Sequence, residues 1–144
     1  MFVLSHRHIE GYVHYSDLNH HLIKLAFYVI LEAIERVALD SVQGRDDRES
    51  LKKDLAPARF KQIEDAYKRT GDAARSLSTY LNISDLLRLA AKADAIHIEE
   101  GLVRVIKGVR DASAHPSNNL ISDYSDVKKL ADVKRECLRV LGAA

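Results

Sequence analysis

Apolar residues recur at every third or fourth position along most of the chain, which is the spacing of amphipathic α-helices. The longest of these patterns follows Ser16 and Asp17, either of which can cap a helix, and it predicts a helix that ends near Asp40. One broad side is apolar, at Leu22, Leu25, Ala26, Phe27, Val29, Ile30, Leu31, Ala33, Ile34 and Val37. The remaining strip is polar, at Lys24, Tyr28, Glu32, Glu35 and Arg36. A helix this apolar is expected either at the centre of a bundle or in a subunit interface.

The middle of the chain predicts shorter helices separated by polar turns. After a polar connection, a short helix is expected near Leu51. Pro57 suits the first turn of a helix that ends at Thr70. Asn82 and Asp85, three residues apart, resemble a capping pair at the start of a further helix.

Two more helices are predicted in the C-terminal third. The first spans about residues 96–113 and ends because Pro116 disfavours helical dihedral angles at His115. The second begins at a cap formed by Ser125. Cys137 lies on the apolar stripe of this last helix, so the pattern favours a core position for its thiol over a role as a nucleophile.

Residues 1–16 differ in character from the rest of the chain. Two runs of β-favouring residues, 1–4 and 11–15, flank a polar stretch and predict a short β-hairpin. Two strands alone are marginally stable in water, so this hairpin needs the helices, another copy or neighbouring strands. The predicted fold is therefore all-α: an up-and-down bundle of four to five helices over residues 17–144, preceded by the N-terminal β-hairpin.

The composition narrows the classes of function. A length of 144 residues and 47% hydrophobic content suit one domain with a real core. A formal net charge of +1 excludes a protein that coats nucleic acid, so any contact with RNA must be local. The single cysteine excludes an intramolecular disulfide and suits a reducing cytoplasm. The N-terminus lacks the basic-then-apolar pattern of a signal peptide, and the longest apolar run, residues 25–31, is too short to cross a membrane, so we expect a soluble cytoplasmic protein.

The candidate chemistry lies where the penultimate helix ends. A histidine such as His115 can exchange a proton with the 2′-hydroxyl or the leaving oxygen of RNA, and an arginine such as Arg110 can hold the phosphate. An ordinary structural role is also open, because cations in the last turn of a helix are favoured by about 0.3–1 kcal/mol. Asp111 likewise suits an i,i+4 ion pair with Lys107.

The segment from Arg110 to Pro116, placed at the end of the penultimate helix of an all-α chain, resembles the signature of the HEPN superfamily. In that family an Arg, a following polar residue and a His four to six positions later mark the ribonuclease site. Many members have Asn after the Arg, whereas this chain has Asp111. The resemblance covers about residues 18–141 by architecture.

The resemblance implies a metal-independent endoribonuclease that acts as a homodimer and leaves 2′,3′-cyclic phosphate ends. His115 would then be the acid and base, Arg110 the phosphate clamp, and Asp111 the group that orients one of them. Further residues would touch the RNA or remain plain surface residues: Arg104, Lys107, Ser117, Asn118 and Tyr124. No cofactor and no metal ion are implied. A role as a toxin or in defence, with an inhibitory protein partner, belongs to the same interpretation.

Residues 11–18 resemble the closing strand and helix start of a CBS module. Asp17 matches the aspartate of that module, whereas His14 stands where a Ser or Thr helps to hold a nucleotide ribose. The other strands of such a module are absent from the chain. We therefore interpret residues 1–16 as a possible remnant of a CBS-like module and expect no nucleotide binding by it.

Two other classes of function stay open from the sequence. The chain can be a non-catalytic HEPN-like module that binds RNA, a nucleotide or a protein partner and is linked to a sensor domain. It can also be a helical dimerisation domain without a ligand. Five histidines, at positions 6, 8, 14, 20 and 21, match no compact set of metal ligands, so solvated side chains are expected there.

Overall fold

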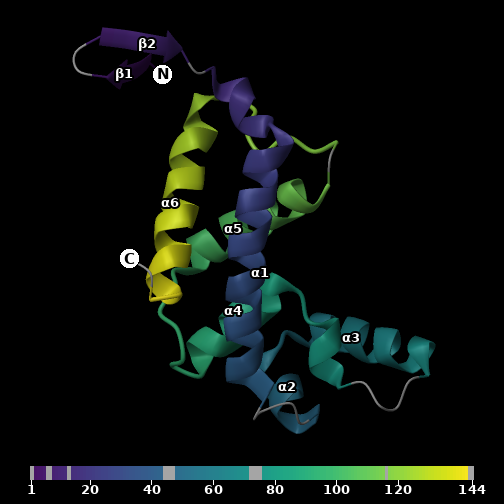
Figure 1. Ribbon diagram of the computed structural model, residues 1–144. Coiled ribbons are helices and arrows are strands. Elements are labelled where there is room, and N and C mark those ends of the chain that lie inside the picture. The colour runs from purple at the N-terminus through teal and green to yellow at the C-terminus, as the bar shows by residue number, and fades with distance from the viewer. Residues whose placement is uncertain are drawn as a thin grey trace. The chain divides into compact units, whose positions relative to one another are not determined.

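The computed structural model describes residues 2–5, 8–12, 14–43, 48–71, 76–115 and 117–142 (Figure 1). These residues are mostly helical, which confirms the all-α class. The six α-helices among them are α1 (His21–Gln43), α2 (Arg48–Asp54), α3 (Pro57–Thr70), α4 (Ile83–Lys92), α5 (Glu100–Ala114) and α6 (Tyr124–Val140). Two short 3₁₀-helices span Tyr15–Asn19 and Leu77–Tyr80.

Two strands, β1 (Phe2–Ser5) and β2 (His8–Tyr12), form an antiparallel pair at the N-terminus. Residues 6 and 7, where the turn is expected, lie outside the described residues, as do residues 1 and 13. The predicted β-hairpin and its boundary at residue 16 therefore stay predictions.

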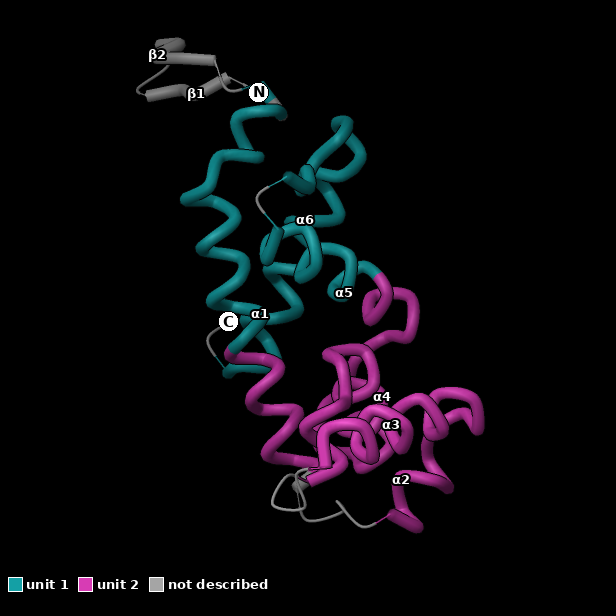
Figure 2. Tube along the Cα trace, turned by 90° about the vertical axis from the view of Figure 1, so that its right-hand side faces the viewer, with its two compact units in different colours: residues 1–32, 105–144 teal, residues 33–104 magenta. Residues whose placement is uncertain are grey.

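The chain divides into two compact units (Figure 2). Unit 1 contains residues 1–32 and 105–144, and unit 2 contains residues 33–104. Helices α1 and α5 each supply residues to both units. Both Arg110 and His115 of the candidate motif belong to unit 1.

The core of unit 1 is built from the apolar positions of α1, α5, the following connection and α6. Its buried apolar residues include Leu31, Ile106, Val109, Leu120, Ile121, Leu130, Val133 and Cys137. Burial raises the pKa of the Cys137 thiol to about 12, so the thiolate is scarce at neutral pH. The prediction that Cys137 is a core residue is confirmed.

The start of the first long helix differs from the prediction. A 3₁₀-helix capped by His14 precedes α1, and the expected cap at Ser16 or Asp17 is wrong. The His14 ring accepts a hydrogen bond from the Ser16 N–H, while the Asp17 carboxylate accepts one from the His14 N–H at 2.8 Å. Asp17 is thus the acidic partner of a capping box, three residues inside the cap.

The predicted start of the penultimate helix at residue 96 is also wrong. Helix α4 ends near Lys92, and Asp94 adopts a positive φ of 57°, which turns the chain away from the helical path. The α5 hydrogen bonds begin only at the carbonyl of Glu99, which accepts from Leu102 and Val103. A cap at Asp123 starts α6, with its carboxylate accepting from the Ser125 and Asp126 N–H groups, in place of the predicted Ser125 cap.

Unit 2 contains a buried ion pair that the pattern did not predict. The Asn82–Asp85 capping box at the start of α4 is confirmed, with each side chain bonded to the other residue's N–H. Asp85, which is 5% exposed, also accepts hydrogen bonds from Nε and Nη2 of Arg59 in α3 at 2.9 and 2.7 Å. Arg59 donates to the Tyr80 carbonyl at 3.3 Å as well. One carboxylate therefore completes the capping box of α4 and holds α3.

Helices α2 and α3 are separate helices, as the sequence predicted for residues near Leu51 and from Pro57 to Thr70. Ala56 precedes Pro57 and adopts extended dihedral angles, with φ −59° and ψ 139°. The proline thus interrupts the helical path between Asp54 and its own position, and it starts α3 as the sequence predicted.

Replacing Asp85 by Ala is expected to lower the free energy of unfolding by about 3 kcal/mol, because it removes the acidic partner of the α4 capping box and leaves a half-buried guanidinium without its partner. Urea denaturation of the two proteins measures the difference. The control Asp65→Ala, at an exposed position of α3, should change the same quantity by less than about 0.5 kcal/mol. Equal effects of both substitutions would contradict the role assigned to Asp85.

Candidate active site at the end of helix α5

Helix α5 ends at Ala114, so the prediction that the helix stops before His115 is confirmed. Its apolar side is anchored in the interior by Val103, Ile106 and Val109. His115 is the first residue after the helix and is exposed. Within the described part of the chain, its ring makes no hydrogen bond. The imidazole is therefore accessible for contact with a ligand.

The other motif residue, Arg110, rests on an aromatic ring of α1. Its guanidinium carbon lies 5.7 Å from the centroid of the Tyr28 ring, within the range of a cation–π contact. Arg110 is half-buried and does not extend freely into solvent. The contact holds the guanidinium against α1, which restricts where a phosphate can meet it.

A lysine of α1 donates hydrogen bonds to the segment that carries His115. Lys24 is only 7% exposed, and its Nζ donates to the main-chain carbonyl of His115 at 3.4 Å and to that of Asn118. The sequence pattern had placed Lys24 on the polar strip of α1, whereas the structure buries it. Main-chain carbonyl oxygens replace the water that the ammonium loses, which offsets the cost of burial.

A pocket of about 440 Å³ lies between the first half of α1 and the end of α5. It is lined by His21, Lys24, Leu25, Tyr28, Ser113 and Ala114. Its walls therefore combine an apolar and aromatic surface with a few polar groups, which is typical of ligand sites. Tyr28 carries Arg110 and Lys24 holds the His115 carbonyl, so both motif residues are attached to residues of this wall.

Two of the predicted site residues pair with each other. The Lys107 ammonium lies 2.8 Å from the Asp111 carboxylate, one helical turn further along α5, and both side chains are about half exposed. This is the ordinary i,i+4 ion pair that the spacing also predicted. The carboxylate of Asp111 is thus engaged by Lys107.

The remaining predicted residues differ in their relation to the pocket. Asn118 is connected to it through Lys24, and its N–H donates to the His115 carbonyl at 3.1 Å, which closes a turn after α5. Ser117 and Tyr124 are exposed, and neither is among the residues that line the pocket. Arg104 belongs to unit 2. The pKa of Glu100 is lowered chiefly by the hydrogen bond from Arg88, and the charge of Arg104 lowers it further.

Sequence reasoning missed the two α1 residues that make the site. Lys24 and Tyr28 are four residues apart on the polar strip and therefore share one face of the helix. Their polar character within a very apolar helix was the available signal. Nothing in the local pattern indicated that α5 ends against this face.

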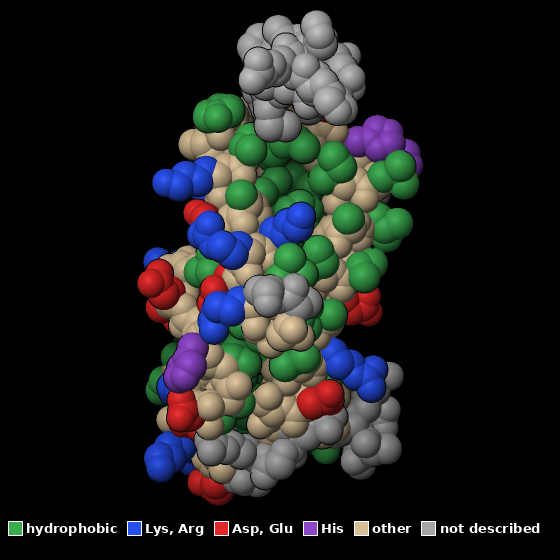
Figure 3. Space-filling view, turned by 60° about the vertical axis from the view of Figure 1, so that its left-hand side comes forward, with side chains coloured by type: hydrophobic (Ala, Val, Ile, Leu, Met, Phe, Trp, Pro, Cys, Tyr) green, Lys and Arg blue, Asp and Glu red, His purple; other side chains and the backbone are tan. Residues whose placement is uncertain are grey.

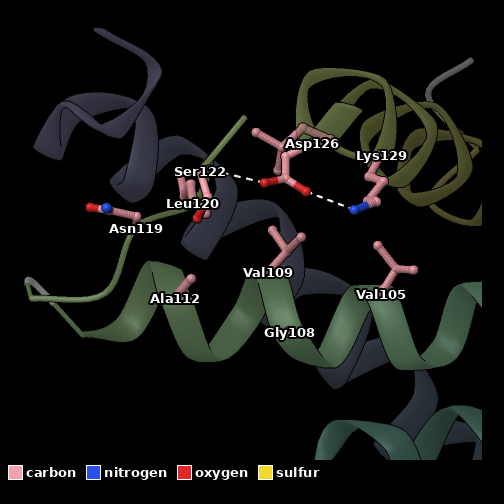
Figure 4. A pocket seen from close by; sticks show the side chains of 10 residues that line it. Val105, Gly108, Val109, Ala112, Asn119, Leu120, Ser122, Asp126 and Lys129 are labelled. Carbon is pink, nitrogen blue, oxygen red and sulfur yellow. Dashed lines mark hydrogen bonds and ion pairs between the residues drawn. The ribbon is translucent and has the colours of Figure 1, made fainter. Parts of the chain in front are cut away.

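A second pocket, of about 300 Å³, lies on another side of α5, against the start of α6 (Figure 4). Its floor contains Val105, Val109 and Ala112, and its rim carries Asp126 and Lys129, whose charged groups are 2.7 Å apart. The motif residues Arg110 and His115 do not line it. This pocket is therefore separate from the candidate site.

Among the described residues, no three His, Cys, Asp or Glu side chains are grouped closely enough to hold a metal ion. No described helix is both long and apolar enough to cross a membrane. Comparison of the chain with protein-family models, curated proteins and solved structures found no match.

Replacing Lys24 by Met is expected to loosen the turn after α5, because two main-chain carbonyls lose their donor. Hydrogen exchange at the Asn118 amide, which is bonded to His115, should become at least about tenfold faster. Lys24→Arg keeps a cationic donor and should restore most of the protection. The control Lys134→Met, at an exposed position of α6, should leave this amide unchanged, and equal exchange in all variants would contradict the tether.

Proposed function

We propose that the chain is a metal-independent endoribonuclease of the HEPN type, with Arg110 and His115 as its catalytic residues. The observation that carries the proposal is the attachment of both motif residues to the wall of one pocket. Arg110 is held through Tyr28, and the main chain of His115 is held through Lys24. An ordinary cationic helix end does not require such a pocket or a buried lysine.

The chemistry follows from the two side chains. The neutral imidazole of His115 accepts the proton of a ribose 2′-hydroxyl while that oxygen attacks the neighbouring phosphorus. The P–O5′ bond breaks, the leaving 5′-oxygen takes a proton from the His115 imidazolium, and the product ends are a 2′,3′-cyclic phosphate and a 5′-hydroxyl. The Arg110 guanidinium donates to the phosphate oxygens, whose negative charge grows in the transition state.

The pocket residues extend this role to the substrate. His21 adds a hydrogen-bonding group, and Tyr28 and Leu25 offer a surface for a base next to the phosphate. Binding of this kind is local, which agrees with a formal net charge of +1. The proposal also includes a homodimer, because two copies of the motif would concentrate positive charge in one cleft. A cytoplasmic location belongs to the same proposal.

One observation favours the alternative, a non-catalytic module that binds RNA or a protein partner. The carboxylate of Asp111, which the motif assigns to orienting a catalytic residue, lies 2.8 Å from Lys107. Loss of that group would leave the binding surface intact and weaken catalysis. The experiment below separates the two functions.

Cleavage of end-labelled structured RNAs in excess EDTA tests the proposal. The wild-type chain should cut and leave cyclic phosphate ends. His115→Ala should reduce the rate by at least about 100-fold, because the proton acceptor is lost. Arg110→Ala should reduce it by about 100-fold or more, because the transition-state charge loses its donor.

Two matched controls accompany these variants. His97→Ala and Arg135→Ala remove the same side-chain types at exposed positions outside the motif, and each should keep the rate within about twofold of the wild type. Circular dichroism confirms that every variant is folded. No cleavage across several RNAs, or equal cleavage by all variants, would overturn the ribonuclease and favour the binding module.

A further inference from the structure

The pocket between α5 and the start of α6 has an apolar floor that one side of α5 supplies. The α5 residues in the floor are spaced as i, i+3, i+4 and i+7, so they share one side of the helix. They are Val105, Gly108, Val109 and Ala112. Leu120 and Leu130 complete the apolar lining from the connection and from α6. Figure 4 shows Val105 and Val109 pointing from α5 toward the start of α6.

The deepest apolar residues of this pocket are recessed. Val109, Leu120 and Leu130 line it although each is at most 8% exposed. Elsewhere in unit 1 apolar side chains protrude, and Figure 3 shows hydrophobic side chains in a column below the upper histidine group. Three apolar residues of α1 are more than half exposed: Leu22, Leu25 and Val29. A recessed floor in a pocket of about 300 Å³, the lower end of the range for ligand sites, suits a small molecule better than the broad surface of a partner protein.

The rim of the pocket carries two opposite charges that neutralise each other. The Lys129 ammonium lies 2.7 Å from the Asp126 carboxylate. That hydrogen bond, followed by the one from the Ser122 N–H, lowers the pKa of Asp126 below its ordinary value, and Asp126 raises the pKa of Lys129. Both groups therefore stay charged at neutral pH, and their charges cancel. A rim without net charge complements a neutral ligand.

The Asp126 carboxylate has room for one further donor. Its Oδ1 accepts from Lys129 Nζ at 2.7 Å, and its Oδ2 accepts from the N–H groups of Ser122 and Asp123 at 2.9 and 3.4 Å. A carboxylate has about four acceptor positions, so one remains, on Oδ1. Figure 4 shows this carboxylate facing the α5 floor. A ligand on the floor can therefore donate a hydrogen bond to it.

We propose that this pocket binds a small neutral aromatic molecule that carries an N–H or O–H donor. A Cβ placed at Gly108 would meet no atom within 4 Å, so the floor beside Val105 and Val109 is open to a flat ring. Burial of the ring supplies most of the affinity, and the hydrogen bond to Asp126 fixes its orientation. Because Arg110 and His115 do not line this pocket, the site is independent of the proposed ribonuclease.

Titration of indole into the ¹⁵N-labelled full chain, followed by NMR of the amide groups, tests the site. Indole is neutral and combines two fused apolar rings with one N–H donor. The amides of Gly108, Ala112 and Ser122 should shift and saturate, with a Kd below about 1 mM. Benzofuran has the same shape with an oxygen in place of the N–H, and it should bind at least about tenfold more weakly, because the bond to a charged acceptor is lost. Benzoate should also bind at least about tenfold more weakly, because its charge repels that of Asp126.

Substitutions that fill the floor locate the binding. Gly108→Leu should weaken indole binding by at least about tenfold, and it should keep the fold, because leucine favours a helix more than glycine does. The matched control is Gly101→Leu, in the same helix, where the added side chain also meets open space but does not line the pocket. Its Kd should stay within about twofold of the wild type. Ala112→Leu enlarges a second floor residue and should weaken binding as Gly108→Leu does.

Several results would overturn the proposal. They are the absence of saturable shifts up to the solubility limit of indole, shifts confined to Leu25 and Tyr28 of the other pocket, equal binding of benzofuran, and equal effects of Gly108→Leu and Gly101→Leu. None of these measurements involves RNA cleavage. Failure of this site and failure of the ribonuclease are therefore distinguished by separate experiments.

Discussion

The burial of the Lys24 ammonium is the interaction on which the candidate site depends. A lysine that is 7% exposed needs acceptors, and these come from the carbonyl groups that follow the end of α5. The carbonyls of His115 and Asn118 belong to a turn that is closed by their own hydrogen bond. The position of His115 relative to α1 is therefore set by main-chain atoms, which leaves its imidazole available.

A second contact on the same side of α1 acts in parallel. Tyr28 follows Lys24 by one helical turn, and Arg110 precedes His115 by five residues. The earlier α1 residue thus contacts the later motif residue and the later one contacts the earlier, so the two segments run in opposite directions along one face. A cation–π contact and a set of lysine–carbonyl bonds together join two segments that are more than 80 residues apart in the chain. Each contact is modest, and both act on the same pocket wall.

Because one face of α1 packs against α5, apolar side chains remain exposed on the other side of the helix. Because Lys24 and Tyr28 turn toward α5, Leu22, Leu25 and Val29 turn toward solvent. An amphipathic helix cannot bury both sides against one neighbour, so apolar surface remains for another partner.

Local chemistry alone determined several features of this protein. The end of α5 before His115 follows from Pro116, the Asn82–Asp85 capping box follows from side chains three residues apart, and the core position of Cys137 follows from the stripe of α6. Each depends on residues within one or two helical turns, and therefore the sequence could predict it.

The tertiary structure decided which of two apolar sides of α1 is buried, and with it the exposure of Lys24 and the place of Tyr28 beneath Arg110. It also decided that Asp85 receives Arg59 from another helix. Periodicity describes one helix at a time and carries no information about the neighbour that covers it. In a helix that is apolar on most of its circumference, only contacts with distant segments select the buried side.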